Sequence, residues 1–421
     1  MASSPDDLVE QKDHPLAARY TAIRAHSLAL IRPLSAEDAC VQAMPDTSPA
    51  KWHLAHVTWF FETFVLEVHE PDFKPFHPAF RALFNSYYNA LGKQFPRAER
   101  GVLTRPSLAE VLTYRANVDA RVLALLSTAE PDLCATIDLG LHHEQQHQEL
   151  LLMDIKYLLS CNPLGPAYRQ IDAQPCPAVA PLAWQSMAAG IVAIGHPGSG
   201  FHFDNETPRH DALLAPHALA SRLVTNGEYL DFMTDGGYGR PSLWLADGWA
   251  TRERCLWRAP EYWRECEGAW FEFTLRGLEP LDLNGPLCHV SHYEADAYAQ
   301  WAAARLPSEF EWEHAAHGQA VTAAVGECAH LHPVTSQRGA AFDDLYGAVW
   351  QWTRSAYLPY PGFTAPAGAI GEYNGKFMSN QMVLKGSCCA TPVGHARASY
   401  RNFFYPHQRW PFTGIRLARD L

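Results

Sequence analysis

The segment that most constrains this chain is residues 139–159, LGLHHEQQHQELLLMDIKYLL. It has no glycine or proline after Gly140, and leucine, methionine and isoleucine fill most of its other positions, so we expect a helix. His143 and His147 are four residues apart, which places both imidazoles on one helical face. This spacing lets two ring nitrogens reach one metal ion, as in the H-E-x-x-H helix of zinc proteases. An isolated pair of this kind is more often a solvated polar face, so a metal site requires a third ligand.

A second pair of histidines lies in SPAKWHLAH, where Ser48 suits a helix N-cap and Pro49 suits the first helical position. The expected helix continues through VTWFFETFVLEV, and His53 and His56 lie on neighbouring parts of one face. Aromatic side chains supply apolar bulk around them: Trp52, Trp59, Phe60 and Phe64. A histidine in such a setting is often a hydrogen-bonded core residue. Three imidazoles without a thiolate or carboxylate would suit Zn, Fe, Cu or Ni and would leave coordination positions open.

Composition narrows the class of protein. A chain of 421 residues, 48% hydrophobic and with 13 tryptophans, is long enough for two packed domains. Its 33 basic and 45 acidic residues give a net charge of −12, which argues against nucleic acid or an anionic membrane as a partner. We find neither an apolar run of 18 residues nor a signal peptide. Ten cysteines at irregular spacing are typical of cytosolic thiols, so we expect a cytoplasmic protein.

The fold class that we expect is α+β, with a helical N-terminal part and a different C-terminal part. Residues 1–162 predict a four-helix bundle, a usual place for a metal site. Its helices are expected at 18–34, 49–68, 107–126 and 139–159, the third opened by a capping box at Ser107 and Glu110. The long connection 83–107 carries Tyr87, Tyr88, Arg97, Arg100 and Arg105, and connections of this length are often functional.

The C-terminal part follows a proline-rich segment, residues 163–184, which we interpret as a linker. In residues 185–421 short apolar runs alternate with glycine, asparagine, aspartate and proline. The run 190–195, GIVAIG, predicts a strand, and 293–305, YEADAYAQWAAAR, predicts a short helix. This pattern is typical of an irregular α+β domain rich in loops.

Two groups of motifs carry a resemblance to a known family. WHLAHVTWFFETF and HHEQQHQELLL resemble the DinB-like domain of ergothioneine-type sulfoxide synthases, the EgtB family. FDNETPRH, VTNGEYLDFM, HVSHYEADAYAQWAAARLPSEFEWEHAA and GAVWQWTRSAY resemble a formylglycine-generating-enzyme-like domain, which has a C-type-lectin-like fold. The two domains together cover essentially the whole chain.

The resemblance implies a mononuclear non-haem iron enzyme that uses O2. Family members join a sulfur donor to the imidazole carbon of hercynine (N-α-trimethylhistidine) and oxidise the sulfur to a sulfoxide. Carried over by motif, the Fe(2+) ligands are His56, His143 and His147, and His53 is a neighbour. Glu149 is then expected to orient a ligand from outside the coordination sphere.

The resemblance also implies residues that act on the reactants. Tyr87 and Tyr88 are similar to the active-site tyrosines of the short EgtB subtype, and a phenol with a pKa near 10 can stay protonated and donate. The remaining candidates are substrate contacts: Gln146, Asn402, and Phe403 or Phe404 for hercynine, and Arg105 or Arg100 for the donor's polar groups. The trimethylammonium group of hercynine favours aromatic faces.

Departures from the family pattern leave the donor open. The usual RGGSCATP is here LKGSCCATP, with Cys388 next to Cys389, and Gln351 stands where W-x-W usually holds a glutamate. The segment after RNFF, YPHQRW, also differs from the common form. One branch of the family, selenoneine synthase (SenA), attaches selenium from a selenosugar to hercynine. A thiol donor and a selenosugar donor therefore both remain.

Three other interpretations stay open. A 5-histidylcysteine sulfoxide synthase usually carries a methyltransferase domain, for which this chain has no room. A formylglycine-generating enzyme needs two separated C-terminal cysteines, and it would leave the bundle unexplained. A non-catalytic protein, with a zinc-stapled bundle on a sugar-binding domain, would hold zinc without turnover.

Overall fold

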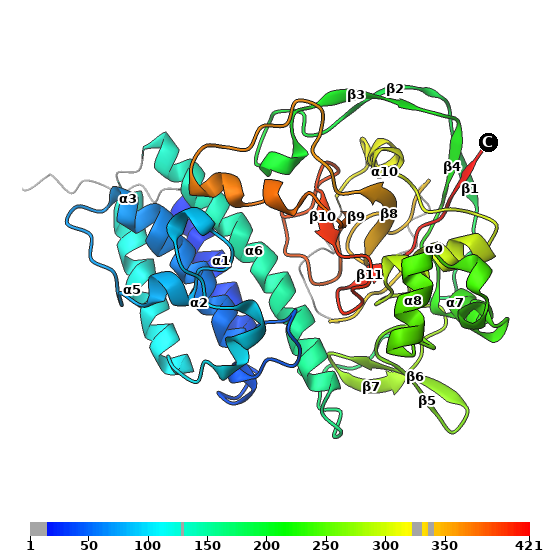
Figure 1. Cartoon of the computed structure of the whole chain (residues 1–421), viewed down its shortest axis with the longest axis horizontal. Helices are drawn as coiled ribbons and strands as arrows, with labels where there is room; N and C mark the ends of the chain where they lie inside the picture. Colours follow the sequence, from blue (N-terminus) through cyan, green and yellow to red (C-terminus); the bar gives the residue numbers. More distant parts are fainter. Residues whose placement is uncertain (1–14, 128–129, 322–330, 336–340) are drawn as a thin grey trace, which may run out of the picture. The chain divides into compact units, whose positions relative to one another are not determined.

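The computed structural model describes residues 15–127, 130–321, 331–335 and 341–421 (Figure 1). The chain forms two compact units, one of residues up to 86 together with 92–147, the other of 87–91 together with 148–421. The boundary at residue 147 falls inside one long helix, and the domain limits drawn from the sequence stay a prediction. The expected α+β class is confirmed. Across the described ranges, none of the helices has the length and apolar character that a membrane span requires.

The first unit is helical, as the sequence predicts. Its helices are α1 (Pro15–Ile31), α2 (Ala50–Phe61), α3 (Glu67–His69), α4 (Phe80–Leu83), α5 (Leu108–Leu126) and the first part of α6 (Pro131–Ser160). Figure 1 shows α1, α2, α5 and α6 packed alongside one another. The capping box that opens α5 is confirmed, since Ser107 accepts from the Glu110 backbone N–H and the Glu110 side chain accepts from the Ser107 N–H.

The start of α2 differs from the prediction. Pro49, not Ser48, is the N-cap, and the Ser48 hydroxyl accepts a hydrogen bond from Arg100 Nη1 at 2.8 Å. All twelve residues of α2 are buried, so this helix is surrounded on every side. The predicted continuation past Phe61 also differs, because residues Glu62–Leu66 form a π-helix before α3. Such π segments are rare in proteins, and those that occur are often found at functional sites.

A buried ion network fixes the rotation of α6 in the first unit. Glu144 Oε2 accepts from Arg24 of α1 at 2.8 Å, Oε1 accepts from Ser27 at 2.5 Å, and Arg115 of α5 also pairs with this carboxylate. Burial favours the neutral acid, but the Arg115 and Arg24 guanidiniums outweigh it and hold the pKa of Glu144 at about 2. Because Glu144 lies beside His143 in the chain, the network also fixes the direction of the histidine face.

Gly140 allows α6 to approach α2 closely. A Cβ atom at this position would lie 2.6 Å from Cε1 of Phe61 and 2.9 Å from Cε1 of Phe60, both well inside normal contact. Only glycine therefore fits here without displacing the two rings. The close approach brings the histidines of α6 to those of α2.

The described residues of the second unit form four small sheets. Its strands are β1 (Trp184–Met187), β2 (Gly190–Ile194), β3 (His210–Leu214), β4 (His217–Ala220), β5 (Trp263–Cys266), β6 (Ala269–Thr274), β7 (Gly277–Pro280), β8 (Trp350–Ala356), β9 (Met382–Gly386), β10 (Asn402–Phe404), β11 (Thr413–Gly414) and β12 (Ala418–Asp420). The strand orders are β1-β4-β12, β10-β9-β8-β11, β2-β3 and β5-β6-β7; β8 and β11 pair in parallel, and the other pairs of these strands are antiparallel. Its complete helices are α7 (Asn226–Thr234), α8 (Ala246–Cys255), α9 (His292–Trp301) and α10 (Glu309–Ala316). The predicted strand at 190–195 and helix at 293–305 are confirmed as β2 and α9.

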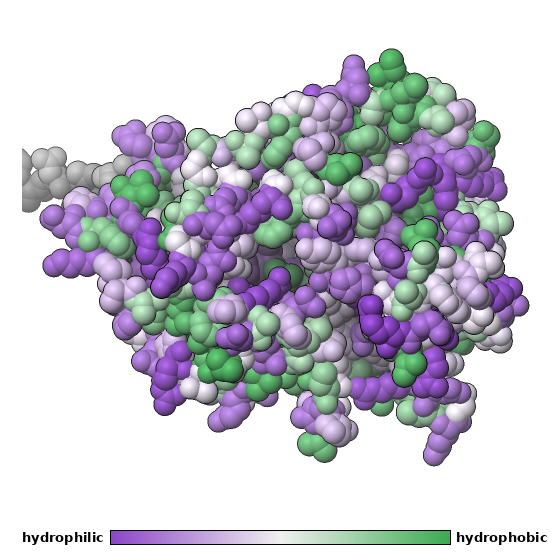
Figure 2. Space-filling model, viewed as in Figure 1, coloured by the Kyte–Doolittle hydropathy of each residue, from purple (hydrophilic) through white to green (hydrophobic). Residues whose placement is uncertain are grey.

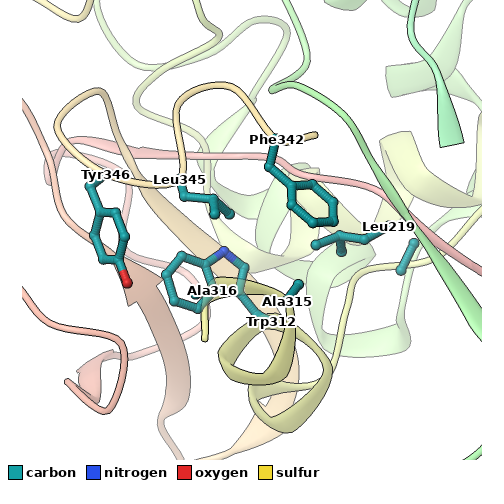
Figure 3. Packing of buried hydrophobic residues seen from close by; sticks show 8 residues of the cluster. Leu219, Trp312, Ala315, Ala316, Phe342, Leu345 and Tyr346 are labelled. Atoms are coloured by element: carbon teal, nitrogen blue, oxygen red, sulfur yellow. The ribbon is translucent and has the colours of Figure 1, made fainter. Parts of the chain in front are cut away.

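The core of the second unit forms around Trp312 of α10 (Figure 3). The residues packed with it are Leu219, Ala315, Ala316, Phe342, Leu345, Tyr346 and Ala418. The indole N–H of Trp312 donates to Gln351 Oε1 at 2.7 Å, so this buried donor is paired. The face shown in Figure 2 carries many polar residues, with apolar residues in groups among them. Ile191 and Leu213, both exposed, lie opposite each other in the β2–β3 pair.

The last thirteen residues of α6, 148–160, pack within the second unit. Glu149 and Lys156 are seven residues apart and so lie on one helical face. Glu149 accepts from Trp350 Nε1 at 2.7 Å and from Thr391 Oγ1 at 2.6 Å. Lys156, fully buried, donates to His289 Nε2 at 2.7 Å and forms an ion pair with Glu272 at 3.4 Å. These contacts attach the end of α6 to β6 and β8.

Candidate metal centre

Three histidines from two helices of the first unit converge. His56 comes from α2, and His143 and His147 come from successive turns of α6. Within the described residues, their candidate ligand atoms all lie within 4.8 Å of one another. The ring centroids are 5.0 Å apart for His56 and His143, and 4.7 Å for each of the other two pairs. The structure thus brings together the three histidines that the sequence motifs single out.

Hydrogen bonding defines which nitrogen of His56 faces the centre. His56 Nδ1 lies 2.7 Å from the backbone carbonyl of Phe84, and a carbonyl can only accept, so Nδ1 carries the proton. The lone pair is then on Nε2, which is buried and has no hydrogen-bond partner among the residues that the structure describes. A buried nitrogen lone pair without a partner is costly. A metal ion at this position would satisfy it.

Burial keeps the three rings neutral, which is the form that binds a metal. Burial lowers the pKa of His143 to about 3. Burial, and then the neighbouring His143 ring, hold the pKa of His56 well below its usual range. The pKa of His147 is lowered by burial first and by His143 and His56 next. At neutral pH the centre therefore offers uncharged imidazoles and no acidic ligand, a set that suits a divalent transition metal.

A stack of flat groups holds His56 in place. The Trp52 ring stacks on the His56 ring, with 4.6 Å between centroids and 13° between planes. The Trp59 ring also stacks on His56, at 5.5 Å and 14°. The Arg100 guanidinium lies over the Trp52 ring, 3.3 Å from its centroid. These contacts restrict rotation of the imidazole before any metal arrives.

His53 contacts a member of the trio, a relation that the sequence motifs do not reveal. Its Nδ1 lies 2.9 Å from Nδ1 of His147, and the two rings are 5.2 Å apart. The signal in the sequence is the three-residue spacing of His53 and His56, which puts both on adjoining parts of α2. A spacing within one helix does not say what the second helix presents to it.

Tyr87 and Tyr88, the predicted proton donors, belong to the second unit. Their rings stack at 4.6 Å and 26°, and Tyr87 also contacts Phe377 edge to face at 5.1 Å. Burial raises the pKa of both Tyr87 and Tyr88, and for Tyr88 the neighbouring Tyr87 and Tyr373 add to the effect. Both phenols are therefore protonated at neutral pH.

The predicted hercynine residues lie on different elements. Gln146 is on α6 in the first unit and is partly exposed. Asn402, Phe403 and Phe404 form β10 of the second unit and are also partly exposed. The Phe403 ring stacks on Tyr357 at 4.1 Å and 12°, and Phe404 meets Trp410 edge to face at 6.0 Å.

The two arginines proposed for the donor differ in setting. Arg105 is exposed and donates to the backbone carbonyl of Thr104 at 3.1 Å. Arg100 is buried, and its guanidinium donates to Ser48 and to Ser86 at 3.0 Å as well as stacking on Trp52. Arg100 thus supports the chain around α2 in this structure.

The positions that depart from the family pattern have structural partners. Gln351 is buried in the core of the second unit, where Oε1 also accepts from Arg416 Nε at 2.7 Å and Nε2 donates to the Leu345 carbonyl at 2.8 Å. Cys388 is buried, and its backbone N–H donates to Thr391 Oγ1 at 2.9 Å. The expectation that Glu149 orients a ligand also differs from the structure, because its carboxylate bonds to Trp350 and Thr391.

Comparison with known proteins agrees with this arrangement. Residues 19–151 match the DinB superfamily, and residues 184–327 and 322–421 match the sulfatase-modifying factor enzyme 1-like domain. The fold and the site thus define a two-domain protein, a DinB-type helical domain with a histidine metal site followed by a sulfatase-modifying-factor-type domain.

Relatives match over nearly the full length. The chain is 31% identical over 433 residues to the hercynine oxygenase of Mycobacterium tuberculosis, which covers 96% of this chain and 99% of that protein. It is 31% identical over 416 residues to the hercynine oxygenase of Mycolicibacterium smegmatis, with 90% and 93% covered. The formylglycine-generating enzyme of Streptomyces coelicolor is 32% identical over 167 residues, 35% of this chain and 51% of that protein. The chain belongs to the hercynine oxygenase family.

Proposed function

We propose that this protein is an iron(II)-dependent, O2-dependent synthase that joins a chalcogen donor to the imidazole carbon of hercynine. The observation that carries the proposal is the convergence of three neutral imidazoles, with a buried Nε2 lone pair on His56 that has no hydrogen-bond partner within the described ranges of the chain. Membership of the hercynine oxygenase family supports iron, hercynine and O2 over the other metals and substrates that this ligand set accepts.

The residues present fit the metal. His56, His143 and His147 would hold the ion, and with no carboxylate among them they leave it positively charged. Ferrous iron, when bound there, would supply open coordination positions and a redox-active centre for O2 activation, while the two substrates supply the electrons. The Trp52 and Trp59 rings keep His56 in the ligand orientation, and burial keeps all three rings unprotonated.

The overall reaction with a thiol donor balances without another reductant. The hercynine C–H and the thiol S–H bonds break, a C–S bond forms, one oxygen atom of O2 goes to the sulfoxide and the other leaves as water with the two hydrogens. A proton must therefore be delivered as oxygen is reduced. We assign this to Tyr87 or Tyr88, whose raised pKa values keep the phenols protonated.

The remaining roles follow from the chemistry of the substrate. The trimethylammonium group has no N–H to donate and favours aromatic faces, which Phe403 and Phe404 supply on β10. Asn402 and Gln146 offer amide groups to the polar atoms of hercynine. Arg105 is the freer of the two arginines to meet the donor's polar groups, because the Arg100 guanidinium already bonds to two serines.

The direct experiment is anaerobic loading with Fe(II), followed by O2 and hercynine with cysteine, γ-glutamylcysteine or a selenosugar in turn. Mass spectrometry of the product identifies the donor, and we expect turnover with one of the three. Tyr87→Phe and Tyr88→Phe should keep the metal, and loss of the true donor should lower turnover by about 10²–10⁴-fold. Tightly held zinc with no O2 consumption in any mixture would instead indicate the non-catalytic binding protein.

A further inference from the structure

We infer that His53 is a positioning residue for the metal ligand His147, an inference that rests on the metal site of the proposed function. His53 is buried on α2, one turn before His56. Its Nδ1 lies 2.9 Å from Nδ1 of His147 on α6. The helix that supplies one ligand therefore also supplies a partner for a ligand of the other helix.

The direction of this hydrogen bond follows from the chemistry of neutral imidazole. A neutral ring carries one N–H and one lone pair, so one of the two Nδ1 atoms must donate and the other accept. If His147 binds a metal through Nε2, its proton must be on Nδ1. Nδ1–H then donates to the lone pair of His53 Nδ1.

The same arrangement is present at His56. There Nδ1–H donates to the Phe84 carbonyl at 2.7 Å, and Nε2 is left for the metal. His53 thus does for His147 what a backbone carbonyl does for His56. Partners of this kind fix the tautomer and ring orientation of a ligating histidine, and their loss typically costs about 10–100-fold in metal affinity.

Packing makes His53 a defined partner. Trp52 contacts the His53 ring edge to face at 5.9 Å and the His147 ring at 6.3 Å, so the same indole that stacks on His56 borders both other rings. His53 and His147 are held at a fixed separation by the close approach of α2 and α6 at Gly140. A residue at position 53 must therefore present an acceptor at the place of Nδ1 to keep His147 oriented.

The test compares asparagine and glutamine at position 53, two amide side chains that place their oxygen at different distances from the backbone. Asparagine at position 53 presents Oδ1 near the position of Nδ1, whereas glutamine presents Oε1 near that of Nε2. We expect His53→Asn to keep Co(II) and Fe(II) affinity within about 3-fold of the wild type, and His53→Gln and His53→Leu to weaken it by about 10–100-fold. The d–d absorption of bound Co(II) and the electron paramagnetic resonance of the Fe(II)–nitrosyl adduct should change in His53→Gln and His53→Leu and be restored in His53→Asn.

A matched control is His142→Gln. His142 is also buried beside the ligands on α6, but its Nε2 meets Arg19 at 2.8 Å, so a glutamine oxygen there can replace it without touching the trio. The inference would be overturned if all three His53 variants kept the metal affinity and the spectra of the wild type. It would also be overturned if His53→Asn and His53→Gln lost equal metal affinity at an unchanged melting temperature. If the wild-type protein itself binds neither ion, the proposed function fails as well, which separates the two results.

Discussion

The close approach of α6 to α2 gives a prediction that separates stability from metal binding. In Gly140→Ala the new Cβ would lie 2.6 Å from Cε1 of Phe61, while ordinary carbon contacts are about 3.5–4.0 Å, so the rings or the helix must move by about 1 Å. Phe60, which the same Cβ meets at 2.9 Å, lies 4.9 Å from the His143 ring. The displacement therefore reaches a predicted ligand directly.

The energetic terms nearly offset each other. Overpacking of this kind costs about 1–3 kcal/mol, and alanine has about 1 kcal/mol better helix propensity than glycine. We expect the free energy of unfolding to fall by only about 0–2 kcal/mol. Functional constellations tolerate about 0.5 Å of displacement, so we expect Fe(II) or Co(II) affinity to fall by about 10-fold or more.

The assay pairs a chemical denaturation curve with a metal titration on the same protein. Gly248→Ala, in α8 of the second unit, is the matched control, because a Cβ there would lie 2.8 Å from Cβ of Tyr293 in α9. It should cost similar stability and leave metal affinity unchanged. Wild-type metal affinity in Gly140→Ala would refute the argument that this glycine sets the distance between the ligands.

Three further predictions follow from individual residues. His143→Ala should abolish metal retention and turnover, measured by metal analysis after gel filtration; retained iron at one equivalent would contradict the ligand assignment. Glu149→Ala should lower the free energy of unfolding by about 2–3 kcal/mol, because the buried Trp350 N–H loses its acceptor; a change under about 0.5 kcal/mol in urea denaturation would contradict it. Burial favours neutral Glu206, but Arg397 and Ser399 outweigh it and hold its pKa below the usual range, so its stabilisation is present above about pH 4.5 and is lost as pH falls through the lowered folded value. The melting temperature of Glu206→Gln should therefore fall less steeply than that of the wild type below about pH 5; identical slopes would count against the pairing.

Features set by short-range pattern were predictable from the sequence. The apolar content of residues 139–159 predicts α6, and the spacing of His143 and His147 fixes that they share a face, whatever they contact. The box at Ser107 and Glu110 involves only neighbouring residues, so the sequence predicts it correctly.

Features that depend on a partner far away in the chain could not be predicted from the sequence. Ser48 has the right chemistry for an N-cap, but a guanidinium 52 residues further along the chain takes its hydroxyl. Glu149 is close to the ligands in sequence, yet six residues from His143 place it about 240° round the helix, and its partners come from β8 and the loop after β9. No sequence motif marks Gly140, because its role is to permit the close approach of α2 and α6, which depends on the tertiary structure.

The indoles on either side of His56 give the centre a built-in optical reporter. Trp52 and Trp59 stack on a ring that would bind the ion, and open-shell transition metals quench the fluorescence of nearby indoles. Since the chain has 13 tryptophans, occupancy should dim only a small share of the total emission. Filling and emptying of the centre can thus be followed in the unlabelled protein, in real time and without any substrate.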